Sequence, residues 1–139
     1  MGMERSGVMR RIVARTGVTT DDTDYPSGAT QAGSIPVPAR ARGAVTHVLV
    51  DLTATGGTPT VRVDIFGYNT ESAIWYWLGA LNDRANIDAG LSPVDNSSNL
   101  RYAEALDHVS AFDRLFPLLT TIAGTSASVD ISFCFEALD

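Results

Sequence analysis

Residue types that commonly serve in catalysis or metal binding are few and scattered in this chain. The only histidines are His47 and His108, and the only cysteine is Cys134. Neither histidine has a Cys, His or carboxylate neighbour at the spacing of metal ligands, so structural or surface positions are predicted for both. No helix N-terminus or basic neighbour is evident that would lower the pKa of the Cys134 thiol, which predicts a small side chain within a strand.

The motifs of the common enzyme classes are also missing from the sequence. It contains neither a Gly-x-Ser-x-Gly nucleophile elbow nor a glycine-rich phosphate loop followed by a helix. The acidic run Asp21-Asp22-Thr23-Asp24 lacks the glycine and the closing glutamate of a calcium-binding loop, which favours a solvated acidic patch. We therefore expect no enzymatic activity, no cofactor and no bound metal.

The one cluster with binding potential is Trp75-Tyr76-Trp77. Consecutive residues of a strand face opposite sides, so the two tryptophans must share one face and Tyr76 must lie on the other. Two interpretations remain open. A second sheet, a loop or an extended arm of the chain covers the tryptophan face, or that face is an exposed platform for a sugar ring or a protein partner.

The bulk composition restricts the class of protein and of partner. The chain has 139 residues, 45% of them hydrophobic, and a net charge of −6. Residues 1–43 contain six arginines against four acids, a net of +2, whereas residues 44–139 contain four arginines against twelve acids, a net of −8. An acidic globule repels nucleic acid, and no apolar run is long enough to span a bilayer. We expect a soluble protein that binds neither nucleic acid nor membranes.

A hairpin over Thr58–Leu81 is the strongest structural signal. Val61, Val63 and Ile65 alternate with polar or aromatic residues, a polar turn follows, and β-branched and aromatic residues resume at Ile74. Further strands are expected over residues 45–54, 100–106, 112–122 and 129–136, with a long connection over residues 82–99. This spacing, without a long helical pattern, predicts an all-β fold, an antiparallel β-sandwich or jelly roll. The predicted interior layer comprises Val48, Val50, Val61, Val63, Ile65, Leu119, Val129, Ile131 and Phe133.

Residues 1–43 show no sustained hydrophobic period. One or two helical turns are conceivable over residues 8–13, and residues 16–43 are rich in Thr, Gly, Ser, Pro, Ala and Asp. The pattern predicts an extended N-terminal arm over residues 1–43 that precedes a β-sandwich domain over residues 44–139.

The order of these elements resembles the small β-sandwich proteins of tailed-phage particles. The features that carry the resemblance are the Gly/Thr turn before Val61-x-Val63-x-Ile65, the tryptophan-containing strand, and the segment FDRLFPLLTTIAG at residues 112–124 that leads into a terminal alternating strand. The likeness covers residues 44–139. Within that group the chain looks most like a capsid decoration, or cement, protein.

This resemblance implies a structural virion protein on the capsid exterior that binds the major capsid protein and forms homo-oligomers, dimers or trimers. The arm would reach neighbouring subunits, and the globule would self-associate through the tryptophan face. The expected partner-binding residues are Arg10, Arg11, Arg15, Arg40, Arg42, Trp75 and Trp77. The alternatives are a carbohydrate-binding module that uses Trp75 or Trp77, and a head–tail connector or tail component.

Overall fold

The computed structural model describes residues 7–39, 45–81, 91–92, 98–106 and 109–138. These residues form eight strands and one short 3₁₀ helix, η2, at Val109–Ala111. The strands are β1 (Gly7–Val18), β2 (Ile35–Pro36), β3 (Thr46–Thr53), β4 (Gly56–Asn69), β5 (Ile74–Ala80), β6 (Leu100–Leu106), β7 (Arg114–Thr125) and β8 (Ser128–Leu138). No helix among the described residues is long and apolar enough to cross a membrane.

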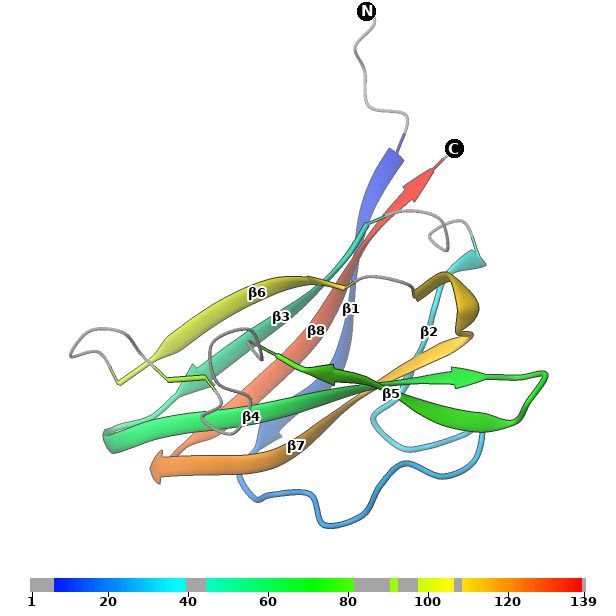
Figure 1. Cartoon of the computed structure of the whole chain (residues 1–139). Coiled ribbons are helices and arrows are strands. Elements are labelled where there is room, and N and C mark those ends of the chain that lie inside the picture. The colour runs from blue at the N-terminus through cyan, green and yellow to red at the C-terminus, as the bar shows by residue number, and fades with distance from the viewer. Residues whose placement is uncertain (1–6, 40–44, 82–90, 93–97, 107–108, 139) are drawn as a thin grey trace, which may run out of the picture.

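The strands form two four-stranded antiparallel sheets that face each other (Figure 1). Sheet A has the order β1-β8-β3-β6, and sheet B has the order β2-β7-β4-β5. The antiparallel pairs β1–β8, β2–β7, β3–β6 and β4–β5 are those of one long hairpin rolled into a sandwich, with the β4–β5 turn at its tip. This arrangement is a jelly roll, so the predicted fold class is confirmed.

The core lies between the two sheets, where one face of each strand is apolar. Val48, Val50 and Leu52 of β3 are buried while their neighbours in sequence are partly exposed, which is the period of two that a half-buried strand requires. Opposite them, β4 contributes alternating valines and Ile65. All nine residues predicted for the interior layer are buried: Val48, Val50, Val61, Val63, Ile65, Leu119, Val129, Ile131 and Phe133.

The N-terminal segment belongs to the jelly roll and is not an arm separate from it. Strand β1 pairs with β8 along the edge of sheet A, from Gly7 opposite Leu138 to Val18 opposite Val129, and residues 8–13 are strand and not helix. Strand β2 pairs with β7 at the edge of sheet B. The described residues 7–39 therefore supply the first two strands of the fold, which places no boundary between an arm and a sandwich after residue 43.

The central hairpin extends further than its sequence pattern indicates. Strand β4 continues through Gly67 and Tyr68 to Asn69, so the turn is confined to residues 70–73, where Ala73 adopts a positive φ of 57°. Position 67 of this strand requires a glycine because the ring of Phe112 lies against it, and a Cβ there would approach that ring to 2.5 Å. Most of the predicted long connection, residues 82–90 and 93–97, lies outside the described residues.

Candidate functional site

The outer face of sheet B carries an aromatic cluster in place of the polar residues expected on a solvated surface. Phe66 of β4 lies between Trp77 of β5 and Phe116 of β7 in the strand register, and Tyr68 lies opposite Trp75. Both tryptophans therefore share this face, as strand geometry requires. Phe66, Phe116 and Leu118 form a small buried cluster there, against which Trp75 packs.

A segment that we name the strap, residues 19–34, crosses this outer face between β1 and β2 (Figure 1). The Trp75 Nε1–H donates a 2.9 Å hydrogen bond to the Gly28 carbonyl, and the ring of Tyr25 meets Phe66 edge-on at 5.8 Å between centroids. Trp75 is consequently half-buried, while Trp77 remains 53% exposed. The strap therefore covers Trp75, as the first interpretation of the tryptophan cluster predicted, and leaves Trp77 exposed.

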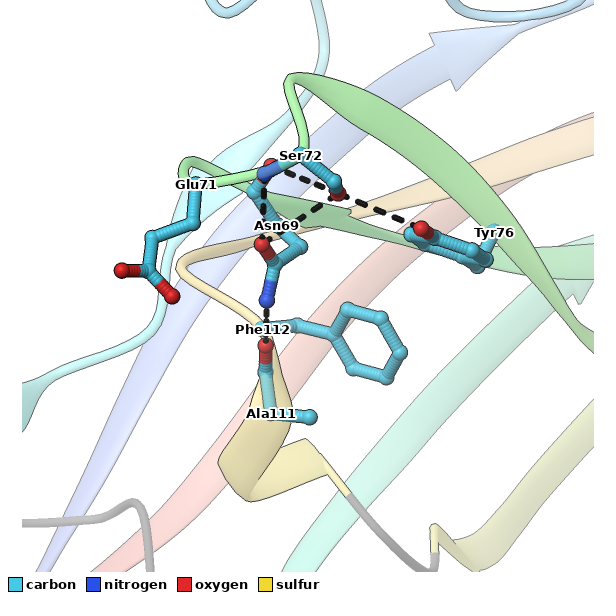
Figure 2. A pocket seen from close by; sticks show the side chains of 6 residues that line it. All are labelled: Asn69, Glu71, Ser72, Tyr76, Ala111 and Phe112. Atoms are coloured by element: carbon cyan, nitrogen blue, oxygen red, sulfur yellow. Dashed lines mark hydrogen bonds between the residues drawn. The ribbon is translucent and has the colours of Figure 1, made fainter.

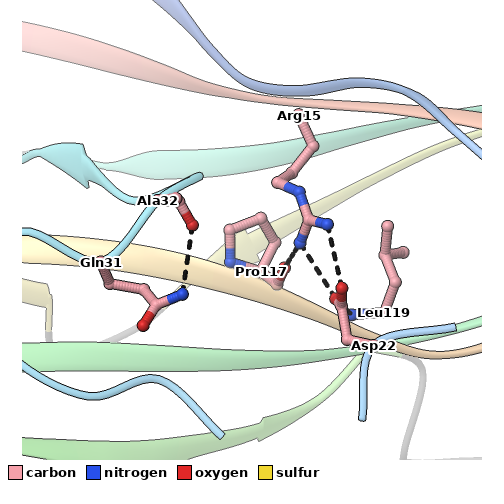
Figure 3. Close-up of polar contacts among 6 residues, drawn as sticks. All are labelled: Arg15, Asp22, Gln31, Ala32, Pro117 and Leu119. Atoms are coloured by element: carbon pink, nitrogen blue, oxygen red, sulfur yellow. Dashed lines mark hydrogen bonds and ion pairs between the residues drawn. The ribbon is translucent and has the colours of Figure 1, made fainter. Parts of the chain in front are cut away.

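Arg15 of β1 fastens the strap to sheet B. Its guanidinium forms a bidentate ion pair with Asp22, with both N–O distances 3.0 Å, and donates a third bond of 3.2 Å to the Pro117 carbonyl (Figure 3). The guanidinium carbon also lies 5.5 Å from the centroid of the Phe116 ring, a cation–π contact. We refer to this group as the Arg15–Asp22 latch.

A bulge in β1 points Arg15 toward sheet B. Val13 lies opposite Ser132 on the outer side of sheet A, but the register then shifts, and Arg15 lies opposite the buried Ile131. Such an extra residue changes the face on which the following side chains lie. Gly33 of the strap makes room for the side chain, because a Cβ at Gly33 would stand 2.6 Å from the Arg15 Cδ.

The acidic run of the strap completes the hydrogen bonding along the edge of β7. The Leu119 N–H donates to the Asp22 carboxylate at 2.8 Å, the Asp22 N–H donates to the Leu119 carbonyl at 2.7 Å, and the Ile122 N–H donates to Asp21 at 2.7 Å. The Pro117 carbonyl points to Arg15, on the side of β7 where no described strand pairs with it, and the N and C=O of a strand residue point to the same side. Pro117 is tolerated in this inner strand because its missing N–H therefore removes no ladder bond. Asp21 and Asp22 are therefore structural acceptors, and Asp21 and Asp24 are also exposed to solvent as the sequence predicted.

Beside the strap the aromatic cluster opens into a hollow of about 410 Å³, which we name the Trp77 hollow. It is lined by Tyr25, Arg62, Asp64, Phe66 and Trp77. The Asp64 Oδ1 accepts from both the Arg62 guanidinium and the Trp77 Nε1–H, each at 3.4 Å. The hollow therefore combines two exposed aromatic rings with a carboxylate and a guanidinium that lie side by side.

A second hollow, of about 510 Å³, lies at the tip of the β4–β5 hairpin (Figure 2). Tyr76 and Phe112 provide its aromatic surface, with ring centroids 6.0 Å apart. Its polar groups largely bond to one another: Asn69 accepts from the Ser72 N–H at 3.0 Å and donates to the Ala111 carbonyl at 2.8 Å, and the Tyr76 hydroxyl donates to the Ser72 hydroxyl at 3.2 Å. These internal bonds give the tip a defined shape and leave few polar groups to contact a ligand.

The structure separates the arginines predicted to bind a partner. Arg10 is exposed on β1, and Arg11 of the same strand is exposed while its Nε donates a 3.0 Å bond to the Ser132 hydroxyl. Arg15 lies within the latch and is only 17% exposed. Arg40 and Arg42 lie outside the described residues.

Two of the remaining chemically versatile residues are cross-strand neighbours in the described part of the chain. His47 and Cys134 lie opposite each other in sheet A, both partly exposed, and His108 lies outside the described residues. Among the described residues, no three His, Cys, Asp or Glu side chains are placed to hold a metal ion.

Sequence reasoning identified Trp77 but not the residues that surround it. Arg62, Asp64 and Phe66 form the outward face of β4, and their alternation with the buried Val61, Val63 and Ile65 is the signal that could have found them. Tyr25 gives no such signal, because the strap that carries it lacks a regular period.

The fold thus defines an eight-stranded jelly roll whose aromatic outer face is partly covered by its own N-terminal segment. No protein-family description and no curated protein sequence matches the chain. Among solved structures, it is similar to the SPBc2 prophage-derived protein YomS, with a TM-score of 0.50 and 10% sequence identity. The match covers 99% of this chain and 100% of that one, and at this identity it shows a common fold.

Proposed function

We propose that this chain is a structural protein of a phage particle that binds and stabilises the capsid as a decoration, or cement, protein. The observation that carries the proposal is the full-length jelly roll, which resembles a prophage-derived protein over 99% of the present chain. Jelly rolls are widely used in viral capsids, where many copies of a rigid β scaffold are needed. The proposal places the protein on the capsid exterior, and the alternatives are a head–tail connector and a tail component.

Exposed apolar side chains on the outer strands support binding to other proteins. Among the described strands, β5 pairs with β4 alone, and it exposes Ile74, Tyr76 and Trp77, which are 51%, 43% and 53% accessible. An edge strand with large apolar side chains is a typical site for contact with another chain. We assign Ile74 and Tyr76 of this edge to contact with the major capsid protein or with further copies of the chain in a dimer or trimer.

In this proposal Arg10 and Arg11 contact the partner from strand β1 of the folded domain. Strand β1 lies at an edge of sheet A. It exposes Met9 and Val13 beside Arg10 and Arg11. A mixed apolar and cationic strand edge suits a protein surface that carries acidic groups. Arg40 and Arg42 remain candidates for the same contact, whereas Arg15 has its donors engaged in the latch.

Co-sedimentation with purified capsids that lack this protein tests the proposal. Wild-type protein should pellet with the capsids and raise the temperature at which they disassemble, and immunogold labelling should place it on the head. The variant Arg10→Glu should bind more weakly, while the matched exposed change Asp24→Asn in the strap should not. Absence of wild-type binding would overturn the capsid role, and gold restricted to the tail would favour the tail component.

A further inference from the structure

We propose that the Trp77 hollow is a binding site for a neutral saccharide, whose ring stacks on Trp77 and whose hydroxyl groups bond to Asp64 and Arg62. This inference goes beyond the virion role and does not depend on it, because the site is complete within one chain. It also differs from a site built on both tryptophans, since the strap covers Trp75.

Two exposed aromatic rings line the same hollow. Trp77 is 53% exposed and Tyr25 is 76% exposed, although they come from β5 and from the strap, which are distant in sequence. An indole or phenol ring in water keeps an apolar face that gains free energy when it is covered. The axial C–H groups of a pyranose form a flat apolar surface of matching size and shape.

The Asp64 carboxylate is nearly buried but accepts only long hydrogen bonds. Its side chain is only 9% exposed, yet its Oδ1 accepts two bonds that are both long, 3.4 Å, from Arg62 and from the Trp77 indole. A carboxylate at this depth gains most from short bonds with good geometry. Sugar hydroxyls at this position could donate short hydrogen bonds to the Asp64 carboxylate while they lie beside the Arg62 guanidinium.

The charges in and around the hollow favour an uncharged ligand. Arg62 and Asp64 lie 3.4 Å apart, so their charges largely cancel at the floor of the hollow. The whole chain carries a net charge of −6, which opposes the approach of phosphates and other anions. A ligand with an apolar face and uncharged hydroxyl groups complements both the aromatic rings and the Arg62–Asp64 pair, whereas a nucleotide or an acidic peptide does not.

The hairpin-tip hollow provides an internal comparison. It is larger and also aromatic, but Asn69, Ser72 and Tyr76 bond among themselves. Apart from the exposed Glu71, its polar side chains therefore already have hydrogen-bond partners within the protein. Tyr76 projects from the same strand as Trp77 but on the opposite face, so it is a matched control residue for the Trp77 hollow.

An array of immobilised mono-, di- and oligosaccharides tests the proposal with the full-length protein. We expect retention of at least one uncharged glycan, followed by calorimetric titration of that same glycan in solution. Trp77→Ala and Tyr25→Ala should each weaken its affinity roughly tenfold, and Asp64→Asn should weaken it by a similar factor. Tyr76→Ala should leave the affinity within about twofold of wild type.

The variants at Trp77 and Tyr25 should fold normally because both side chains are exposed, and unfolding curves establish this directly. No retained glycan, or glycan binding that Trp77→Ala and Tyr25→Ala leave unchanged, would overturn the proposal. Loss of capsid co-sedimentation with intact glycan binding would contradict only the virion role, and the converse would contradict only the saccharide site.

Discussion

Replacing Arg15 by alanine is expected to lower the free energy of unfolding by about 3 kcal/mol, because the latch joins an edge of sheet A to sheet B through the strap. The Arg15 and Asp22 side chains are 17% and 20% exposed, so their ion pair lies between the surface and the fully buried cases. Surface pairs contribute about 0–1 kcal/mol and loss of one partner of a buried pair costs about 3–5 kcal/mol, which suggests about 2 kcal/mol here.

Two further contacts of Arg15 account for the remainder. Its hydrogen bond to the Pro117 carbonyl should contribute about 0.5–1 kcal/mol, since a typical hydrogen bond contributes about 1 kcal/mol net. The cation–π contact with Phe116 at 5.5 Å should contribute a further ~0.5 kcal/mol. Asp22 still accepts the Leu119 N–H in the variant, which limits the cost of leaving its carboxylate without a cation.

Urea unfolding followed by tryptophan fluorescence is a suitable assay, because Trp75 bonds to the strap and should report its release. Arg10→Ala is the matched control: it removes an exposed arginine from the same strand and should change stability by less than about 0.5 kcal/mol. A double-mutant cycle with Asp22→Ala should give a coupling energy of about 1.5–2 kcal/mol. Equal effects of Arg15→Ala and Arg10→Ala, or a coupling energy near zero, would refute this reasoning.

Three other perturbations follow from the packing. Gly67→Ala should destabilise the fold by about 1–3 kcal/mol, since its Cβ would meet the Phe112 ring at 2.5 Å, and an unchanged urea midpoint would show that the ring moves aside freely. Deletion of residues 1–18 should abolish cooperative unfolding, because sheet A loses β1 along most of β8; a sigmoidal melt like that of the full chain would contradict it. Trp75→Phe should cost about 1–2 kcal/mol through the lost bond to Gly28 and the cavity left beside Phe116, whereas Trp77→Phe should be nearly neutral, and comparable thermal shifts for the two would argue against a covering strap.

Strand alternation in the sequence determined much of the jelly-roll core. A strand with one buried face reveals itself by a period of two, as in Val48, Val50 and Leu52 or in Val129, Ile131 and Phe133. The same rule placed Trp75 and Trp77 on a common face. These conclusions depend only on the backbone geometry of single strands, so they can be drawn without knowledge of the pairing between strands.

The role of the N-terminal residues could be decided only by the tertiary structure. Strand β1 is an edge strand whose outer face is solvated and whose period is broken by a bulge, so its sequence resembles that of an unstructured segment. Its partner, β8, lies at the other end of the chain. Pairing of such distant segments leaves no mark in a local pattern. For this reason the sequence predicted an arm where the structure has the first strand of the jelly roll.

The same limit applies to the individual residues of the candidate sites. Arg15 and Arg10 are equivalent in the sequence, but the bulge and the strap place one in an ion pair and leave the other exposed. Trp75 and Trp77 are equally equivalent until the strap covers one of them and brings Tyr25 beside the other. The sequence by itself determined which faces are apolar, and only the path of the chain across sheet B decided which of those apolar side chains remain open to a partner.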